Sequence, residues 1–198
     1  MRSTQHWLGA LILFALVINL GGCGINDIPT YDEQVKAAWS QVQNQYQRRA
    51  DLVPNLVATV KGYATHEKDV LIAVTQARSR VGSLQLPANI TENPAAFKKF
   101  EAAQKNLTGA LSRLLVVSEN YPQLKANQNF LTLQSQLEGT ENRISVARRD
   151  YIQAVQKYNT ELRTIPGRWY ASMFYPDAKV KQNFTTAKEN FKAPKVSF

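Results

Sequence analysis

The sequence has very few residues of the kinds that bind metals or act as nucleophiles. Its 198 residues include one cysteine, Cys23, and two histidines, His6 and His66. A single cysteine excludes a disulfide within the chain and a metal site built from several thiolates. His66 and Glu67 begin a string similar to the zinc motif H-E-x-x-H, but Val70 stands where the second histidine would be, so the motif fails. We therefore expect no metal and no cofactor.

The sequence also lacks the glycine-rich motifs that bind phosphates or present a nucleophile. It contains no G-x-x-x-x-G-K-[ST], no G-x-G-x-x-G and no G-x-S-x-G, and no strand pattern persists. Acidic residues are scarce: 24 Lys and Arg stand against 15 Asp and Glu, for a net charge of +9. Arg2 is the only charged side chain before Cys23, so the chain from Cys23 onward has a net charge of +8. Such a surface favours acidic partners, which are anionic lipid headgroups, acidic polymers or nucleic acid.

An apolar run near the N-terminus has the features of a signal peptide. Residues 7–20 are apolar apart from Asn19, and this run of 14 is short for a membrane-spanning helix. The stretch LGGC that follows resembles a bacterial lipobox, in which Leu20, Gly21 and Gly22 are recognised by the signal peptidase and Cys23 receives the lipid. We expect a signal peptide at 1–22, a tether at 23–30 and stable anchoring by two or three acyl chains. The alternative is an uncleaved signal anchor.

Helical periodicity dominates residues 31–163. Apolar residues recur three or four apart from Val35 to Val81, and Pro54 interrupts them, so we expect a kink there or a helix that ends near Ala50. The second helix is expected after a cap at Thr91 or Asn93 and before Pro122, and the third from about Asn127. A heptad-like seam then follows, formed by Phe130, Leu137, Ile144, Tyr151 and Tyr158. The pattern predicts an all-α, antiparallel up-and-down helical bundle.

The C-terminal tail, residues 164–198, differs from the bundle in composition. Six Lys or Arg stand against Asp177 and Glu189, and aromatic residues are interleaved with them. A short helix near 178–191 fits the pattern. The tail is interpreted as an extension that wraps the bundle, or as a binder of anionic lipid or cell-wall polymer. Stacking on single-stranded nucleic acid is not expected, because a secreted lipoprotein rarely meets it.

Two stretches carry more than periodicity, and together they closely resemble the LemA family. The first is RRADLVPNLVATVKGYATHE, residues 48–67, and the second is ENYPQLKANQNFLTLQSQLEGTENRISVARRDYIQAVQKYNT, residues 119–160. The resemblance covers essentially the whole chain after Cys23. It implies a four-helix bundle attached to the bacterial envelope by its N-terminus. The family has no established activity, so the resemblance implies no reaction. A lipobox-like end departs from the N-terminal membrane helix that is usual in the family.

The polar residues of these stretches are the candidate functional residues. In one interpretation, Glu119, Glu138 and Glu141 form an acid–base or cation-binding set with Arg48 and Arg148. In the favoured one, the carboxylates pair with arginines across the bundle and fix helix register. Asn55 is expected to satisfy the backbone groups that Pro54 frees. The full set of structural or partner-binding candidates is Arg48, Arg49, Asp51, Pro54, Asn55, Lys61, His66, Glu67, Glu119, Tyr121, Pro122, Glu138, Glu141, Asn142, Arg143, Arg148, Arg149, Tyr158 and Asn159.

The sequence predicts a non-enzymatic lipoprotein of the bacterial cell envelope. We expect it at the periplasmic face of the outer or inner membrane, or at the cell surface of a Gram-positive cell, as a scaffold or adaptor for another envelope protein. Two alternatives remain open. One is an enzyme that uses Glu119, Glu138 and Glu141, and the other is direct binding of anionic lipid or wall polymer by the tail.

Overall fold

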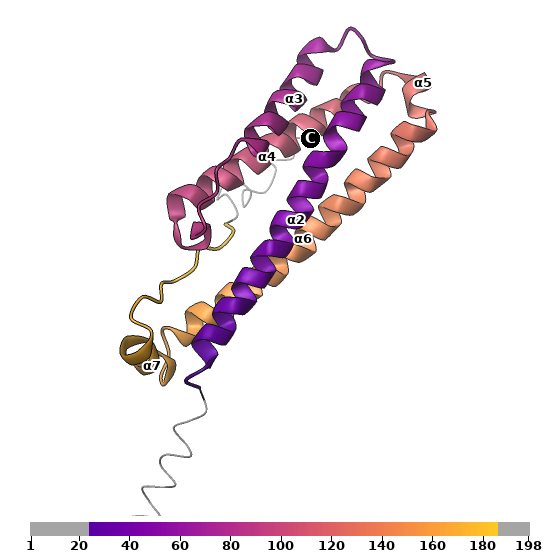
Figure 1. Ribbon diagram of the computed structural model, residues 1–198. Helices are drawn as coiled ribbons and strands as arrows, with labels where there is room; N and C mark the ends of the chain where they lie inside the picture. Colours follow the sequence, from indigo (N-terminus) through magenta and orange to yellow (C-terminus); the bar gives the residue numbers. More distant parts are fainter. Residues whose placement is uncertain (1–23, 186–198) are drawn as a thin grey trace, which may run out of the picture.

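The computed structural model describes residues 24–185, whose regular structure is entirely helical. Four long helices run in alternating directions along a common axis (Figure 1). They are α2 (Asp27–Lys61), α3 (Lys68–Gly82), α4 (Pro94–Ser118) and α6 (Gln128–Glu161). The short elements are the 3-10 helix η1 (Ile90–Glu92), α5 (Pro122–Lys125) and α7 (Gly167–Phe174). The all-α, up-and-down bundle predicted from the sequence is confirmed.

Several predictions concern residues outside this range. The signal peptide, Leu20, Gly21, Gly22 and the lipid-accepting Cys23 all lie before residue 24. Helix α2 begins at Asp27, inside the segment that was expected to be a tether. The start is favourable because Asp27 complements the helix dipole, and Pro29 falls in the first turn, where an amide hydrogen has no partner within the helix. Within residues 24–185, no helix combines the length and apolarity that crossing a membrane requires.

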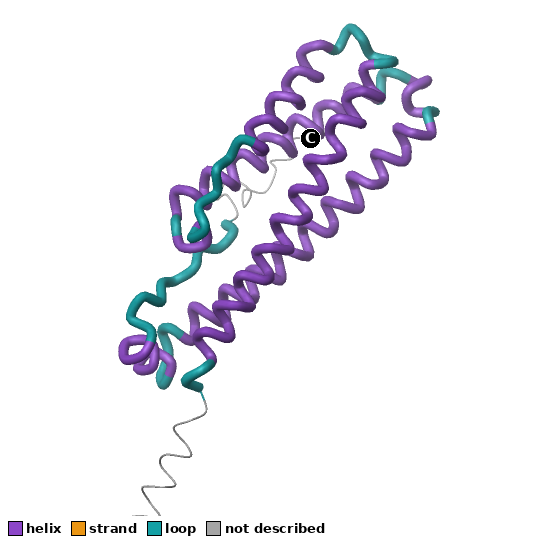
Figure 2. The backbone as a smooth tube through the Cα atoms, viewed as in Figure 1, coloured by secondary structure: helices purple, strands orange, loops and turns teal. Residues whose placement is uncertain are grey.

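The bundle is uneven because its helices differ in length. Helices α2 and α6 have 35 and 34 residues, whereas α3 has 15 and α4 has 25. The long pair therefore extends beyond α3 toward the end where α2 begins. Helix α7 lies at that end, and the segment 175–185 runs from it toward η1 (Figure 1 and Figure 2). The end with α7 is called the near end below, and the end with α5 the far end.

Two buried cores fill the bundle. The aromatic core lies toward the near end, and its largest members are Trp39, Tyr46, Phe97, Phe100, Tyr151 and Tyr158. The aliphatic core lies toward the far end and is built mainly from Val53, Leu56, Val60, Val74, Leu107, Leu111, Leu114, Leu124 and Leu137. All five residues of the predicted heptad seam are buried, so this part of the sequence interpretation is confirmed.

Asparagine side chains cap two of the long helices. Asn93 Oδ1 accepts hydrogen bonds from the amides of Ala95 and Ala96, both at 3.1 Å, and Pro94 follows as the first helical residue. Asn127 Oδ1 accepts one from the amide of Phe130 at 3.0 Å. Such a cap stabilises a helix by about 1 kcal/mol. The predicted starts of α4 and α6 are therefore confirmed.

Pro54 does not end the first helix, so of the two alternatives left open by the sequence, the one with a helix that ends near Ala50 is excluded. Helix α2 continues through Pro54 to Lys61, and the chain breaks instead at residues 62–67. A proline at position 54 leaves the carbonyl of Ala50 without its helical donor. Arg78 of α3 supplies the missing hydrogen bond, because its Nε donates to Ala50 O at 3.2 Å. The expected compensation by Asn55 does not occur; Asn55 is exposed.

The tail contains a helix in a different place from the one predicted. Helix α7 spans Gly167–Phe174, whereas residues 178–185 are not helical and the rest of the predicted helix lies outside the described range. The segment 175–185 packs on the bundle. Phe184 enters the aromatic core, with its ring 5.0 Å from that of Phe97 and 5.5 Å from that of Tyr151. The guanidinium of Arg148 covers the same ring at 4.3 Å.

The contact between Arg78 and Ala50 makes a testable prediction about Pro54. Arg78→Ala should lower the free energy of unfolding by about 1 kcal/mol, because it leaves a carbonyl without a donor. In a Pro54→Ala background the amide of residue 54 donates to Ala50, so the same change should cost less than half as much. Urea unfolding of the four proteins measures both effects. Equal costs in the two backgrounds would show that Arg78 acts elsewhere.

Candidate functional site

A buried arginine joins three helices in the middle of the bundle. The side chain of Arg49, on α2, is 1% exposed. Its Nη1 donates to Glu141 Oε1 of α6 at 2.6 Å and to Thr108 Oγ1 of α4 at 2.7 Å. Its Nη2 donates to Oε1 and to the carbonyl of Gln104, also on α4, at 2.7 and 3.2 Å. The guanidinium also lies 5.0 Å from the ring centre of Tyr46. We call these residues the Arg49 layer.

The Arg49 layer lies at the boundary between the two cores. On α2, Arg49 falls between Tyr46 of the aromatic core and Val53 of the aliphatic core. Gln104 occupies the same level on α4, and Glu141 does so on α6. Two donating nitrogens of the guanidinium are satisfied, while Nε has no partner in the described structure. A buried charge with several hydrogen-bond partners tolerates little sliding of the helices, so the layer fixes their register.

The three candidate catalytic carboxylates do not form one set. Glu141 pairs with Arg49, Glu138 accepts a hydrogen bond from Gln134 at 3.0 Å, and Glu119 pairs with Lys125 at the far end. Glu119 and Glu138 therefore have partners only on their own stretch of chain. Across residues 24–185, no cluster of three or more His, Cys, Asp or Glu side chains is arranged to hold a metal. The acid–base arrangement proposed for these carboxylates is not assembled.

Other motif residues hold the far end of the bundle together. The hydroxyl of Tyr121 donates to Glu67 Oε1 at 3.0 Å and links the α4–α5 turn to the α2–α3 turn. Asn127 Nδ2 donates to the hydroxyl of Tyr63 at 2.8 Å. Pro122 is the first residue of α5. Asp51 accepts a hydrogen bond from Gln47 within α2 at 2.7 Å. Six further motif residues are exposed as well: Arg48, Lys61, His66, Asn142, Arg143 and Arg149.

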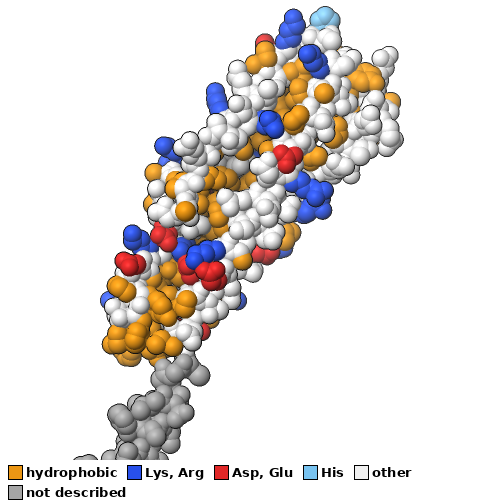
Figure 3. Space-filling view, in the orientation of Figure 1, with side chains coloured by type: hydrophobic (Ala, Val, Ile, Leu, Met, Phe, Trp, Pro, Cys, Tyr) orange, Lys and Arg blue, Asp and Glu red, His pale blue; other side chains and the backbone are white. Residues whose placement is uncertain are grey.

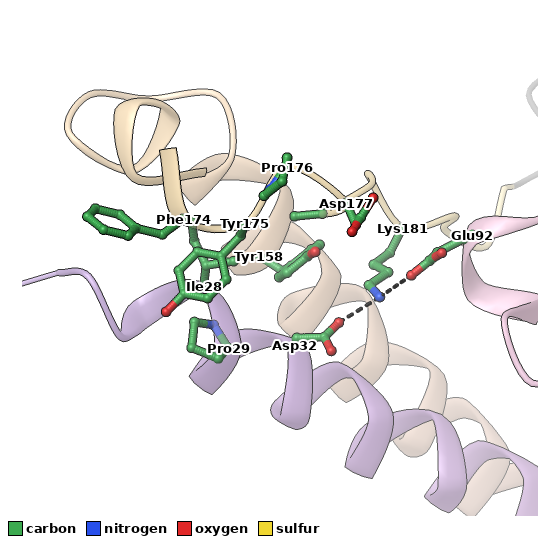
Figure 4. Close-up of a pocket in the computed structure, with 11 residues that line it drawn as sticks. Ile28, Pro29, Asp32, Glu92, Tyr158, Phe174, Tyr175, Pro176, Asp177 and Lys181 are labelled. Carbon is green, nitrogen blue, oxygen red and sulfur yellow. Dashed lines mark hydrogen bonds and ion pairs between the residues drawn. The ribbon is translucent and has the colours of Figure 1, made fainter. Parts of the chain in front are cut away.

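A second buried cation fixes the near end. Lys181 lies in the segment after α7, and its side chain is 4% exposed. Its Nζ contacts Asp32 Oδ1 of α2 at 2.6 Å and Glu92 Oε1 of η1 at 2.7 Å (Figure 4). The ammonium also lies 5.1 Å from the ring centre of Tyr158 on α6. One lysine from the tail therefore contacts three elements of the bundle.

Backbone hydrogen bonds hold the same segment in place. Asn159 accepts from the amide of Lys181 at 2.8 Å and donates to its carbonyl at 3.0 Å, as a neighbouring strand would. The amide of Gln182 donates to Thr91 O at 2.6 Å, and the carbonyl of Gln182 accepts from the hydroxyl of Tyr151 at 2.7 Å. The motif residues Tyr158 and Asn159 thus position the tail.

A cavity of about 330 Å³ lies beside Lys181. Its lining comes from the start of α2, the end of α7 and the turn that follows, and it includes Ile28, Phe174 and Tyr175 (Figure 4). The ammonium of Lys181 is already contacted by two carboxylates and an aromatic ring. We therefore interpret Lys181 as a tie between elements and not as a group that waits for a ligand.

The charges around Lys181 shift one another's pKa values. Burial alone would lower the pKa of Lys181, but its hydrogen bonds with Asp32 and Glu92 outweigh burial and raise it above its ordinary 10.5. Burial alone would raise the pKa of Asp32, but the hydrogen bonds from Lys181 and Lys36 hold it below its ordinary 3.8. Both groups stay charged over the whole physiological range.

The sequence interpretation missed the partners of its own candidate residues. Gln104, Thr108 and Arg78 lie outside the quoted motifs, and nothing in their spacing identifies them as hydrogen-bond partners. Lys181 was counted only as one of the six cations of the tail. No signal in one sequence separates it from Lys179, which is exposed.

The Arg49 layer predicts unequal costs for its two charged members. Glu141→Ala should lower the free energy of unfolding by about 3 kcal/mol, because it leaves the Arg49 charge buried without its counter-charge. Arg49→Met should cost only about 1–2 kcal/mol. Glu141 is 41% exposed and can be solvated by water, so only Gln104 and Thr108 lose a donor without replacement.

Glu138→Ala is the matched control for this comparison, because Glu138 is exposed on the same helix one turn away. It should cost less than about 0.5 kcal/mol. Urea unfolding of the three variants ranks the costs. If Glu141→Ala were as mild as Glu138→Ala, the layer would not carry the bundle's register.

The pair formed by Lys181 and Asp32 predicts how the docking of segment 175–185 depends on pH. The pKa of Asp32 is depressed, so its contribution is complete above 3.8 and is lost as the pH falls through the lower folded value. The pKa of Lys181 is raised, so its contribution is complete below 10.5 and is lost above the folded value. Hydrogen exchange of this segment should therefore be protected equally from pH 5 to 9, after correction for intrinsic rates, and should lose protection in stronger acid.

Lys181→Met should remove most of this protection at neutral pH, because Asp32 and Glu92 then face each other without the ammonium. Lys179→Met is the control, since Lys179 is exposed on the same segment. Full protection in Lys181→Met would show that Phe184 and the backbone hydrogen bonds hold the segment without the ion pairs.

The sequence is similar to a known protein family and to several of its relatives. The family model described as LemA family matches residues 38–198. The chain is 26% identical over 162 residues to magnetosome protein MamQ 2 of Paramagnetospirillum magneticum (strain ATCC 700264 / AMB-1), an alignment that covers 74% of the chain and 60% of that protein. It is 23% identical over 139 residues to protein LemA of Metamycoplasma hominis, which covers 70% of the chain and 59% of that protein. The chain therefore spans about 60% of the length of these relatives.

The family match extends over most of the chain and includes the helices that supply Arg49, Gln104 and Glu141, as well as the segment that supplies Lys181. We conclude that this chain belongs to the LemA family.

Proposed function

We propose that the protein is a non-enzymatic, lipid-anchored protein of the bacterial cell envelope, whose helical bundle acts as a scaffold or adaptor for another envelope protein. The dispersal of the candidate carboxylates is the observation that carries this proposal. Glu119, Glu138 and Glu141 each have a different local partner, and the one that is paired with an arginine helps to join helices. The name LemA and the names of the relatives reported above state no reaction.

The exposed motif residues offer a surface for such a partner. Asn142, Val146 and Arg149 are spaced by four and three residues, so they share one outer face of α6. Val146 is 46% exposed, although it is apolar, and Arg143 lies beside this face and is exposed as well. A surface that combines an apolar centre with arginines favours a partner that has acidic residues around an apolar contact. We call this surface the outer α6 face.

Segment 175–185 of the tail supports direct binding of anionic lipid or wall polymer less well. Lys181 is one of the six cations of the tail, and it is buried and paired with two carboxylates. Phe184, one of the interleaved aromatic residues, is packed in the aromatic core. Lys181 and Phe184 are thus used for packing, and neither is free to bind such a ligand.

Photo-crosslinking in intact cells tests the scaffold proposal. A photoreactive phenylalanine analogue at Val146 or Asn142 should give a discrete crosslinked product, whose second component mass spectrometry identifies. The same analogue at Ser112, exposed on α4, is the matched control and should not give this product. If the outer α6 face yields no product that the control lacks, the partner surface is not there. A hydrolytic activity of the purified protein that disappears in Glu138→Gln would contradict its non-enzymatic nature.

The lipid anchor makes a separate prediction. Cys23→Ser should abolish acyl labelling and leave an unprocessed precursor, because the thiol that receives the lipid is lost. Metabolic labelling with an alkyne fatty acid, followed by gel mobility, measures both effects. Normal mobility of the variant would contradict processing at Cys23, and the uncleaved signal anchor would then explain attachment to the membrane.

A further inference from the structure

The near end of the molecule exposes a patch of large apolar side chains. Ile165 is 64% exposed, Trp169 60%, Met173 74% and Phe174 51%. These residues fall within a stretch of ten, which includes all of α7. In the space-filling view, hydrophobic side chains gather at this end, while charged side chains lie further along the bundle (Figure 3). We call these four residues the α7 patch. A contiguous apolar surface of this kind usually marks a protein–protein or membrane contact.

Packing holds the α7 patch in a fixed orientation. Tyr170 and Ala171 of the same helix pack against the aromatic core. The first residue of the helix, Gly167, is buried so close to Glu161 that a Cβ atom would collide with the carbonyl oxygen and the carboxylate of that residue. These contacts hold α7 in place, while Trp169 and Met173, one turn apart, are exposed.

The patch lies where the chain enters the bundle. A Cβ atom on Gly24 would lie 3.4 Å from Cε2 of Tyr170, so α7 lies beside the residue that directly follows Cys23. One residue spans at most about 3.6 Å. A lipid on Cys23 would therefore emerge within a few ångströms of α7, with no linker that could hold the bundle away from the bilayer. The same holds for an uncleaved signal anchor, which also ends before Gly24.

The cations near the patch suit a membrane surface. Arg163 and Arg168 flank it, and both are exposed. Apolar side chains that enter the boundary between headgroups and acyl chains, next to arginines that meet anionic headgroups, are typical of interfacial helices. Tryptophan favours the same layer.

We propose that the α7 patch is buried in the headgroup layer of the membrane that holds the anchor. The bundle then stands with its near end on the bilayer and its far end away from it. This inference rests on the N-terminal attachment in the proposed function. It assigns the patch to lipid and leaves the outer α6 face open to a protein partner. Since α2 alone is roughly 50 Å long at 1.5 Å per residue, the far end would lie well outside the headgroup layer.

Quenching of tryptophan fluorescence by brominated lipid tests this orientation on the full-length, membrane-extracted protein. The probe is a vesicle of phosphatidylethanolamine and phosphatidylglycerol with brominated phosphatidylcholine. In a Trp7→Phe background, Trp39 and Trp169 are the only tryptophans. Trp39 is buried in the aromatic core, and the further variant Trp169→Phe reports its signal alone. We expect Trp169 to be quenched at least threefold more than Trp39.

Two variants make the result specific. Met173→Glu should reduce the quenching of Trp169 by at least half, and it should not affect folding because the side chain is 74% exposed. Val116→Trp, combined with Trp7→Phe and Trp169→Phe, places a tryptophan at a 70% exposed position near the end of α4, at the far end. This tryptophan should be quenched no more than Trp39.

Flotation of the vesicles separates the two proposals. If the protein floats with the vesicles and Trp169 is quenched as expected, both stand. If it floats but Trp169 is quenched no more than the tryptophan at position 116, the assignment of the α7 patch to lipid is wrong, while the anchor is retained. If it does not float, both the anchor and the membrane-facing patch are overturned.

Discussion

The fold depends most on the buried charge of Arg49, which lies between two hydrophobic cores of a four-helix bundle. Apolar stripes alone let helices slide by a turn with little loss of contact, because one buried leucine replaces another. The Arg49 layer removes that freedom. Its guanidinium, 1% exposed, must reach Glu141, Thr108 and Gln104 together, and only one register of α2, α4 and α6 allows it. Its position between the aromatic and aliphatic cores ties the two halves to each other.

The remaining polar contacts repeat this arrangement at the two ends. Tyr121 and Glu67 join turns at the far end, while Lys181 joins α2, η1 and the tail at the near end. The Lys181 contacts matter at the near end because α3, with 15 residues, is too short to cover the aromatic core there. Phe184 and the segment around it fill the place that a longer helix would occupy. The C-terminal segment up to residue 185 is therefore part of the bundle, and the outward faces of α6 and α7 remain for contacts with other molecules.

The periodic parts of the sequence predicted the bundle well. The heptad seam of α6 and the caps at Asn93 and Asn127 depend on neighbours within the same helix, which one sequence displays. The sequence left two alternatives for Pro54, because its compensation comes from Arg78, 24 residues later, and a single sequence does not show which side chains meet across helices. Helix α7 was missed because eight residues after a proline give little periodicity. The partners of Arg49 and Lys181 were unpredictable for the same reason as Arg78: they are defined by packing and not by spacing.

The central claim is that Arg49 and Glu141 stabilise the bundle through each other. A double-mutant cycle measures this coupling directly, with Arg49→Met, Glu141→Leu, the double variant and the unmodified protein compared by urea unfolding. We expect a coupling free energy of about 2 kcal/mol or more, with the double variant more stable than Glu141→Leu alone, because the double variant lacks the stranded charge of Arg49. Additive effects, with a coupling near zero, would contradict it.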